Sequence, residues 1–128
     1  MNSQVLLYTR DPNFDGLLSE ALSATGAIVL IARTVADALQ IVCQRGRNLD
    51  FALMDFGGGC RGMTLLSAVH TCYEELPVLV TTSEDAEHAT ALAYANGARG
   101  CLTKPSHAAS LTAAIADLKE NRRQLAAA

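Results

Sequence analysis

Short apolar runs alternate with helix-like segments along the whole chain. The apolar runs cover residues 5–8, 27–31, 51–54, 78–81 and 100–103, and residues typical of loops bound each one. Runs of four or five apolar residues predict strands that are buried on both faces of a sheet. The alternation therefore predicts five strands, each followed by a helix.

The segments between the runs carry apolar residues at helical spacing. The clearest helix begins after Thr34, a predicted N-cap, and ends at Gly46. Its apolar face is predicted to consist of Val35, Ala38, Leu39 and Val42. Gly26 and Gly97 are expected to end the first and fourth helices, and Ser106 to cap the last one.

Five strand–helix units with short connections predict one α/β domain. Right-handed crossovers between such units give a doubly wound parallel sheet with helices on both faces. The domain is expected to cover residues 4–119. Residues 120–128 favour a helix, and we expect a C-terminal helical extension or the start of a linker there.

Three polar residues stand at or just past the ends of predicted strands. Asp55 follows the third apolar run, Thr82 the fourth and Lys104 the fifth. In open α/β sheets, the functional crevice lies outside the carboxyl ends of the strands. A carboxylate, a hydroxyl and an ammonium group are therefore expected to converge there, which suits the binding and sensing of an anionic group.

Composition narrows the classes of partner. The net charge is −3 and 18% of the residues are charged, so no basic surplus indicates nucleic-acid binding. The longest apolar stretch, residues 27–32, is too short to cross a membrane, and the first residues lack signal-peptide features. We therefore expect a cytoplasmic protein. Its four cysteines lack metal-site spacing and are expected to be reduced thiols.

Together these features resemble the receiver (CheY-like) domain of two-component response regulators. The resemblance rests on Asp55, Thr82 and Lys104-Pro105, each at the end of the corresponding strand. It implies a flavodoxin-like fold with strand order 2-1-3-4-5. It also implies a signalling domain, with at most autocatalytic phosphoacceptance, in which Asp55 is the phosphoacceptor, Thr82 the switch hydroxyl and Lys104 the phosphate counterion. The implied cofactor is Mg²⁺, and the implied partner is a histidine kinase or a phosphotransfer protein.

The chain departs from this family where an acidic pair is expected. If the first strand and Pro12 are aligned with the family pattern, Thr9 and Arg10 occupy the two positions of the acidic pair. If the alignment is shifted by one residue, Arg10 and Asp11 occupy them. In both registers a guanidinium replaces a carboxylate, although Mg²⁺ favours carboxylate ligands. The tentative metal ligands are Asp11 and Asp55. We hypothesise that Arg10 pairs with Asp55 in place of the metal; the alternative is that Arg10 points into solvent.

Further departures surround the predicted site. The loop from Gly57 to Gly62 is rich in glycine, which gives its backbone unusual freedom. Cys101 stands where the family has a switch aromatic residue in its fifth strand. Ser83 and Pro105 adjoin Thr82 and Lys104 and are expected to shape their surroundings.

Two other functions stay open at this stage. One is a phosphorylation-independent pseudo-receiver that acts as an interaction module. The other is a flavodoxin-like binder of a small anion or nucleotide, although no phosphate-binding loop follows the first strand. A homodimer through the fourth helix, fifth strand and fifth helix is a further expectation, because both helices carry faces of small residues.

Overall fold

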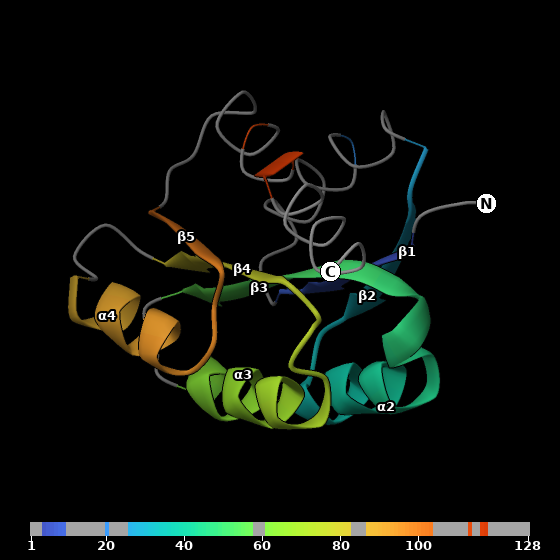
Figure 1. Ribbon diagram of the computed structural model, residues 1–128, viewed down its shortest axis with the longest axis horizontal. Coiled ribbons are helices and arrows are strands. Elements are labelled where there is room, and N and C mark those ends of the chain that lie inside the picture. The colour runs from blue at the N-terminus through green and yellow to red at the C-terminus, as the bar shows by residue number, and fades with distance from the viewer. Residues whose placement is uncertain are drawn as a thin grey trace.

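A five-stranded parallel sheet forms the centre of the molecule (Figure 1), in the order β2-β1-β3-β4-β5. This computed structural model describes residues 4–9, 20, 26–57, 61–82, 87–103, 113 and 116–117. The strand order confirms the expected doubly wound, flavodoxin-like arrangement. Its elements are β1 (Gln4–Tyr8), β2 (Ile28–Ala32), α2 (Val35–Arg45), η1 (Gly46–Asn48), β3 (Leu49–Gly57), α3 (Arg61–Cys72), β4 (Val78–Thr82), α4 (Glu87–Ala95) and β5 (Gly100–Thr103).

The third strand is longer than its apolar run predicts. β3 extends to Gly57, because Asp55 pairs with Thr81 and Gly57 pairs with Thr82 of β4. Asp55 and Thr82 therefore lie within strands, whereas the sequence pattern placed them just beyond. Backbone pairing does not depend on an apolar side chain, so the apolar run marks only the buried part of the strand.

Helix α2 confirms the predicted cap and apolar face. The amide of Asp37 donates a hydrogen bond to Thr34 Oγ1 (3.1 Å), which satisfies one of the free N–H groups of the first turn. Ala38 and Val42 are buried, and Gly46 ends the helix. The apolar stripe thereby fixes which side of α2 faces the sheet.

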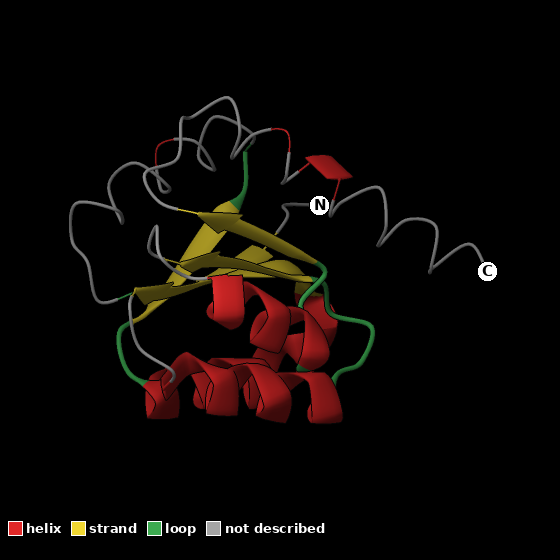
Figure 2. Cartoon of the chain, turned by 90° about the vertical axis from the view of Figure 1, so that its left-hand side faces the viewer, coloured by secondary structure: helices red, strands yellow, loops and turns green. Residues whose placement is uncertain are grey.

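The two faces of the sheet carry separate sets of buried side chains. On one face, Tyr8, Met54 and Val80 pack with residues of α2, α3 and α4, and the three helices lie together on that side of the sheet (Figure 2). On the other face, a row of leucines runs across three strands. Leu7 pairs with Leu53, and Leu53 pairs with Leu79. All three are at most 1% exposed.

The turn after α4 requires a glycine. Gly97 has φ +108°, and a Cβ atom there would lie 2.5 Å from Cγ of His70. Both observations confirm Gly97 as the helix stop predicted from the sequence. Of the expected first and last helices, the described residues include Glu20, Ala113, Ala116 and Asp117, all helical. The cap expected at Ser106 lies outside the described residues.

Candidate functional site at the carboxyl edge of the sheet

A row of polar side chains continues the row of leucines toward the carboxyl ends of the strands. Because side chains alternate across a strand, residues two positions beyond Leu7, Leu53 and Leu79 point to the same face. These residues are Thr9, Asp55 and Thr81. Tyr8 pairs with Met54, which brings Thr9 beside Asp55, and Asp55 pairs with Thr81 directly. The Thr9–Asp55–Thr81 row thus takes one residue from each of three neighbouring segments: the residue that follows β1, and one residue each of β3 and β4.

Each threonine of this row donates a hydrogen bond to a different carboxylate oxygen of Asp55. Thr9 Oγ1 donates to Oδ2 at 2.9 Å, and Thr81 Oγ1 donates to Oδ1 at 3.2 Å. Asp55 is 8% exposed, Thr81 1% and Thr9 0%. A buried carboxylate needs donors to offset the water it has lost, and hydrogen bonds to a charged group are stronger than those between neutral groups. The row therefore holds the largely buried Asp55 side chain in a defined orientation.

Thr82, the predicted switch hydroxyl, lies on the opposite face of β4 from Thr81. It follows Val80 by two positions, and Val80 packs with Met54 on the helix-covered face. Thr82 is 0% exposed, and its hydroxyl has no hydrogen-bond partner among the described residues. An unpartnered buried hydroxyl costs free energy, and no described residue offsets this cost for Thr82.

Several predicted site residues lie outside the described part of the chain. Arg10, Asp11, Ser83, Lys104 and Pro105 are among them. The predicted pairing of Arg10 with Asp55 therefore stays a prediction. Gly57 is described, as the residue of β3 that pairs with Thr82, and the ladder shifts register between Asp55 and Gly57.

The described residues at this edge do not by themselves fit Mg²⁺, the ion that receiver domains typically bind. Magnesium requires octahedral oxygen ligands and is usually held through one or two carboxylates. In the described part of the chain, no group of three or more His, Cys, Asp or Glu side chains is placed to hold a metal. Asp55 is the one carboxylate of the row, and each of its oxygens already accepts a threonine hydroxyl. Asp11, the tentative second ligand, is not among the described residues.

Cys101 takes part in a contact between β5 and α4. Its Sγ lies 3.6 Å from Oγ1 of Thr90, and it packs against the helix-covered core. Cys101 pairs with Val80, two residues before Thr82. The position expected to hold a switch aromatic residue thus carries a small side chain with a weak polar contact to the neighbouring helix.

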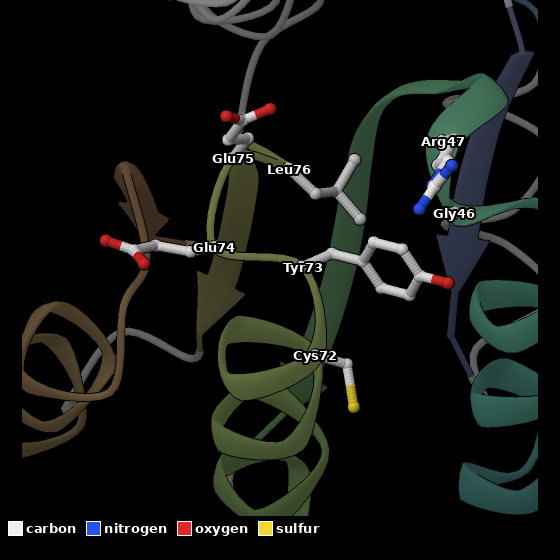
Figure 3. Close-up of a pocket in the computed structure, with 7 residues that line it drawn as sticks. All are labelled: Gly46, Arg47, Cys72, Tyr73, Glu74, Glu75 and Leu76. Carbon is white, nitrogen blue, oxygen red and sulfur yellow. The ribbon is translucent and has the colours of Figure 1, made fainter.

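A separate hollow of about 400 Å³ lies at the other end of the sheet (Figure 3). It is formed where α2 and α3 end, and the Tyr73 ring projects toward Gly46 and Arg47. These residues precede β3 and β4, whereas Asp55 lies near the end of β3. The hollow is therefore distinct from the Thr9–Asp55–Thr81 row.

The sequence pattern singled out Asp55 but not Thr81, whose hydroxyl donates a hydrogen bond to it. Both threonines of the Thr81-Thr82 pair were available, and the pattern favoured Thr82 because it ends the apolar run. The missed signal is strand alternation, since Thr81 shares a face with Leu79, whereas Thr82 shares one with Val80. Thr9 was predicted as part of the site through its alignment, and its contact with Asp55 places it there.

Comparison with protein families gives one match that spans most of the chain. The model of the response regulator receiver domain matches residues 5–116. Among curated proteins, the search finds none that matches. Within the part of the chain that the structure describes, no helix is long and apolar enough to cross a membrane.

Solved structures with the same fold come from several organisms. A receiver domain protein of Clostridium thermocellum has a TM-score of 0.86 at 21% identity, over 96% of this chain and 98% of that one. A response regulator described as putative, from Chloroflexus aurantiacus, has a TM-score of 0.82 at 25% identity, over 94% and 99%. An orphan response regulator of H. pylori has a TM-score of 0.80 at 19% identity, over 91% and 96%. The strand order and the buried aspartate near the carboxyl end of β3 agree with the family match. The chain therefore belongs to the response regulator receiver domain family, whose members are signalling modules of two-component systems rather than enzymes.

Proposed function

We propose that this receiver domain accepts a phosphoryl group on Asp55 from a histidine kinase or a phosphotransfer protein. Membership of the family implies a histidine kinase as partner. The observation that carries the choice of Asp55 is its position, as a buried carboxylate near the carboxyl end of β3, held in one orientation by two hydroxyl donors. We further propose that the domain covers residues 4–119, that residues 120–128 form a C-terminal helical extension or the start of a linker, and that the protein is cytoplasmic.

The chemistry requires Asp55 as a nucleophile. One of its carboxylate oxygens forms a bond to phosphorus, while the bond between phosphorus and the donor atom breaks and the leaving group takes the electron pair. Positive charge and hydrogen-bond donors near the phosphoryl oxygens stabilise such a transfer. In the proposal Lys104 supplies the charge, and Thr82 donates its hydroxyl to a phosphoryl oxygen. Thr82 lies on the face of β4 opposite to Thr81 and Asp55, so this role requires the end of β4 to turn; the Thr82 hydroxyl is available for it, because it has no hydrogen-bond partner among the described residues.

Labelling with acetyl phosphate tests the acceptor. Wild-type protein is expected to gain one phosphoryl group, detected by intact-protein mass spectrometry, and Asp55→Asn to gain none. Asp50→Asn is the matched control, because Asp50 lies at the other end of the same strand and is not buried. Labelling of Asp55→Asn at the wild-type rate would refute Asp55 as the acceptor.

We further propose that Arg10 makes the site metal-poor. A fixed guanidinium beside Asp55 would attract the carboxylate and oppose a divalent cation. In the same labelling assay, Arg10→Asp is expected to bind Mg²⁺ more tightly than wild type and to be labelled faster when Mg²⁺ is added. Ordinary magnesium-dependent labelling of the wild type would contradict this part of the proposal.

A phosphorylation-independent pseudo-receiver is the second candidate. The hydrogen bonds from Thr9 and Thr81 favour it, because both oxygens of Asp55 already have donors without any phosphoryl group or metal. If the wild type is not labelled by acetyl phosphate or by kinases, this candidate replaces phosphoacceptance. The family match makes a small-anion or nucleotide binder the weaker interpretation.

A homodimer through α4, β5 and the last helix is also proposed. Tyr94 on α4 is 51% exposed, so its ring is available for contact with a second copy of the chain. Sedimentation of wild type and Tyr94→Lys tests it. A concentration-dependent dimer that the substitution removes is expected, and a wild-type monomer at all concentrations would rule the dimer out.

A further inference from the structure

We propose that Thr9 and Thr81 are positioning residues that orient the Asp55 carboxylate for attack on a phosphoryl donor. The proposal rests on the proposed function of Asp55 and adds to it the two groups that set the geometry of the nucleophile. Neither hydroxyl belongs to the predicted set of phosphoacceptor, switch hydroxyl and counterion.

The geometry assigns each threonine one oxygen. Thr9 donates from the end of β1 to Oδ2 (2.9 Å), and Thr81 donates from β4 to Oδ1 (3.2 Å). A carboxylate that is held at both oxygens, from both neighbouring strands, has little freedom to rotate about its Cβ–Cγ bond. The remaining lone pairs then keep a fixed direction relative to the edge of the sheet, which is how a bound nucleophile gains reactivity through orientation.

The leucine row beneath supports this orientation. Leu7, Leu53 and Leu79 are at most 1% exposed and lie on the same face, two residues earlier in the same three strands. Their strands fix the spacing of the two donors relative to Asp55. The threonine hydroxyls are also neutral, so they orient Asp55 without a net positive charge in the row.

The first test compares substitutions that remove a hydroxyl with those that keep it. Thr9→Val and Thr81→Val are each expected to lower the rate of acetyl-phosphate labelling about tenfold, and the double variant to lower it further. Thr9→Ser and Thr81→Ser retain the donor and are expected to label at close to the wild-type rate. Thr71→Val is the control, because Thr71 is exposed and bonds only locally, to the Ser67 carbonyl.

The outcomes separate this proposal from the proposed function. If wild type is labelled and the valine variants are labelled equally fast, the threonines do not position Asp55, while Asp55 stays the acceptor. If valine and serine variants lose labelling alike, the effect is general damage to packing, which also overturns the proposal.

A second test does not depend on phosphorylation. Buried hydroxyl protons that donate to a carboxylate exchange slowly with water, so NMR of wild type is expected to show separate hydroxyl signals for Thr9 and Thr81. Asp55→Ala removes their acceptor and is expected to abolish both signals. Rapid exchange of both hydroxyl protons in the wild type would overturn the proposal, even if Asp55 is not labelled at all.

Discussion

The sulfur of Cys101 on β5 lies 3.6 Å from the hydroxyl oxygen of Thr90 on α4. From the family resemblance, an aromatic side chain that changes position with the switch hydroxyl is expected at the position of Cys101. A thiol is too small to move between buried and exposed positions as a ring does. Signalling from Asp55 to α4 is therefore expected to depend on the backbone of β4 and β5 rather than on a swinging side chain.

Truncating Cys101 tests how much this contact contributes. Cys101→Ala is expected to lower the free energy of unfolding by about 1 kcal/mol, because the sulfur packs against the core and its weak hydrogen bond is lost. Urea denaturation followed by circular dichroism measures it. Cys43→Ala is the control, since Cys43 is exposed and its truncation should change stability by less than about 0.5 kcal/mol.

Gly97 gives a sharper prediction about backbone geometry. Gly97→Ala is expected to lower the free energy of unfolding by about 2 kcal/mol or more, because φ is +108° and the new Cβ would lie 2.5 Å from Cγ of His70. Gly26→Ala is the matched control: φ is +80°, but nothing lies within 4 Å of its Cβ position. Gly26→Ala should lower the free energy of unfolding by only about 1 kcal/mol, which is the strain of placing a residue with a Cβ in the left-handed backbone conformation.

The His70 side chain separates the two contributions at Gly97. In a His70→Ala background, Gly97→Ala is expected to lower the free energy of unfolding by less than it does in the wild type, because the ring is gone, although the Cβ of residue 70 still lies 2.9 Å from the new Cβ. An unchanged cost in that background would show that contact with the imidazole ring contributes nothing.

The leucine row predicts a large loss of stability from a single truncation. Leu53 is 1% exposed and lies between Leu7 and Leu79 in the middle of the sheet. Leu53→Ala is expected to lower the unfolding free energy by about 2–5 kcal/mol, since neighbouring strands cannot close the cavity. Leu39→Ala on α2, where the side chain is only partly buried, should cost clearly less in the same denaturation assay. Equal costs would contradict the view that the strands hold the cavity open.

Most of the fold could be predicted from the sequence, because buried parallel strands and capped helices have local signatures. Thr34, Gly46 and Gly97 marked helix ends correctly, since each position depends on the chemistry of one residue and its neighbours. The end of β3 was predicted less well. The last residues of β3 are in the strand because they pair with β4. This pairing joins segments that are distant in the sequence, so the residues next to it in the chain do not indicate it.

At the candidate site, one contact of Asp55 could not be predicted from the sequence. Asp55 was singled out from its place after an apolar run, but the sequence did not indicate that Thr81, the neighbour of the predicted switch residue Thr82, donates a hydrogen bond to it. Choosing between adjacent threonines requires the register of β4 against β3, because a shift of one residue exchanges the two faces. Register depends on packing across the whole sheet, so a count along one strand could not supply it.

Adjacent threonines on β4 are therefore expected to respond in opposite ways to the same substitution. Thr82→Val removes a buried hydroxyl that has no partner among the described residues, and valine has a similar shape. It is expected to raise the unfolding free energy by about 1 kcal/mol, because the desolvation cost of the hydroxyl disappears. Thr81→Val removes a donor from a buried carboxylate and is expected to lower it by about 1–3 kcal/mol.

Denaturation of both variants in one buffer measures the difference directly. The two side chains have the same composition and nearly the same burial, so each variant is the control for the other. If both variants are destabilised equally, the Thr82 hydroxyl has a partner in solution and is no free donor for a phosphoryl group. If Thr82→Val is more stable yet signals poorly to a partner, the unpartnered hydroxyl is retained for function at the expense of stability, as the proposed donation to a phosphoryl oxygen on Asp55 requires.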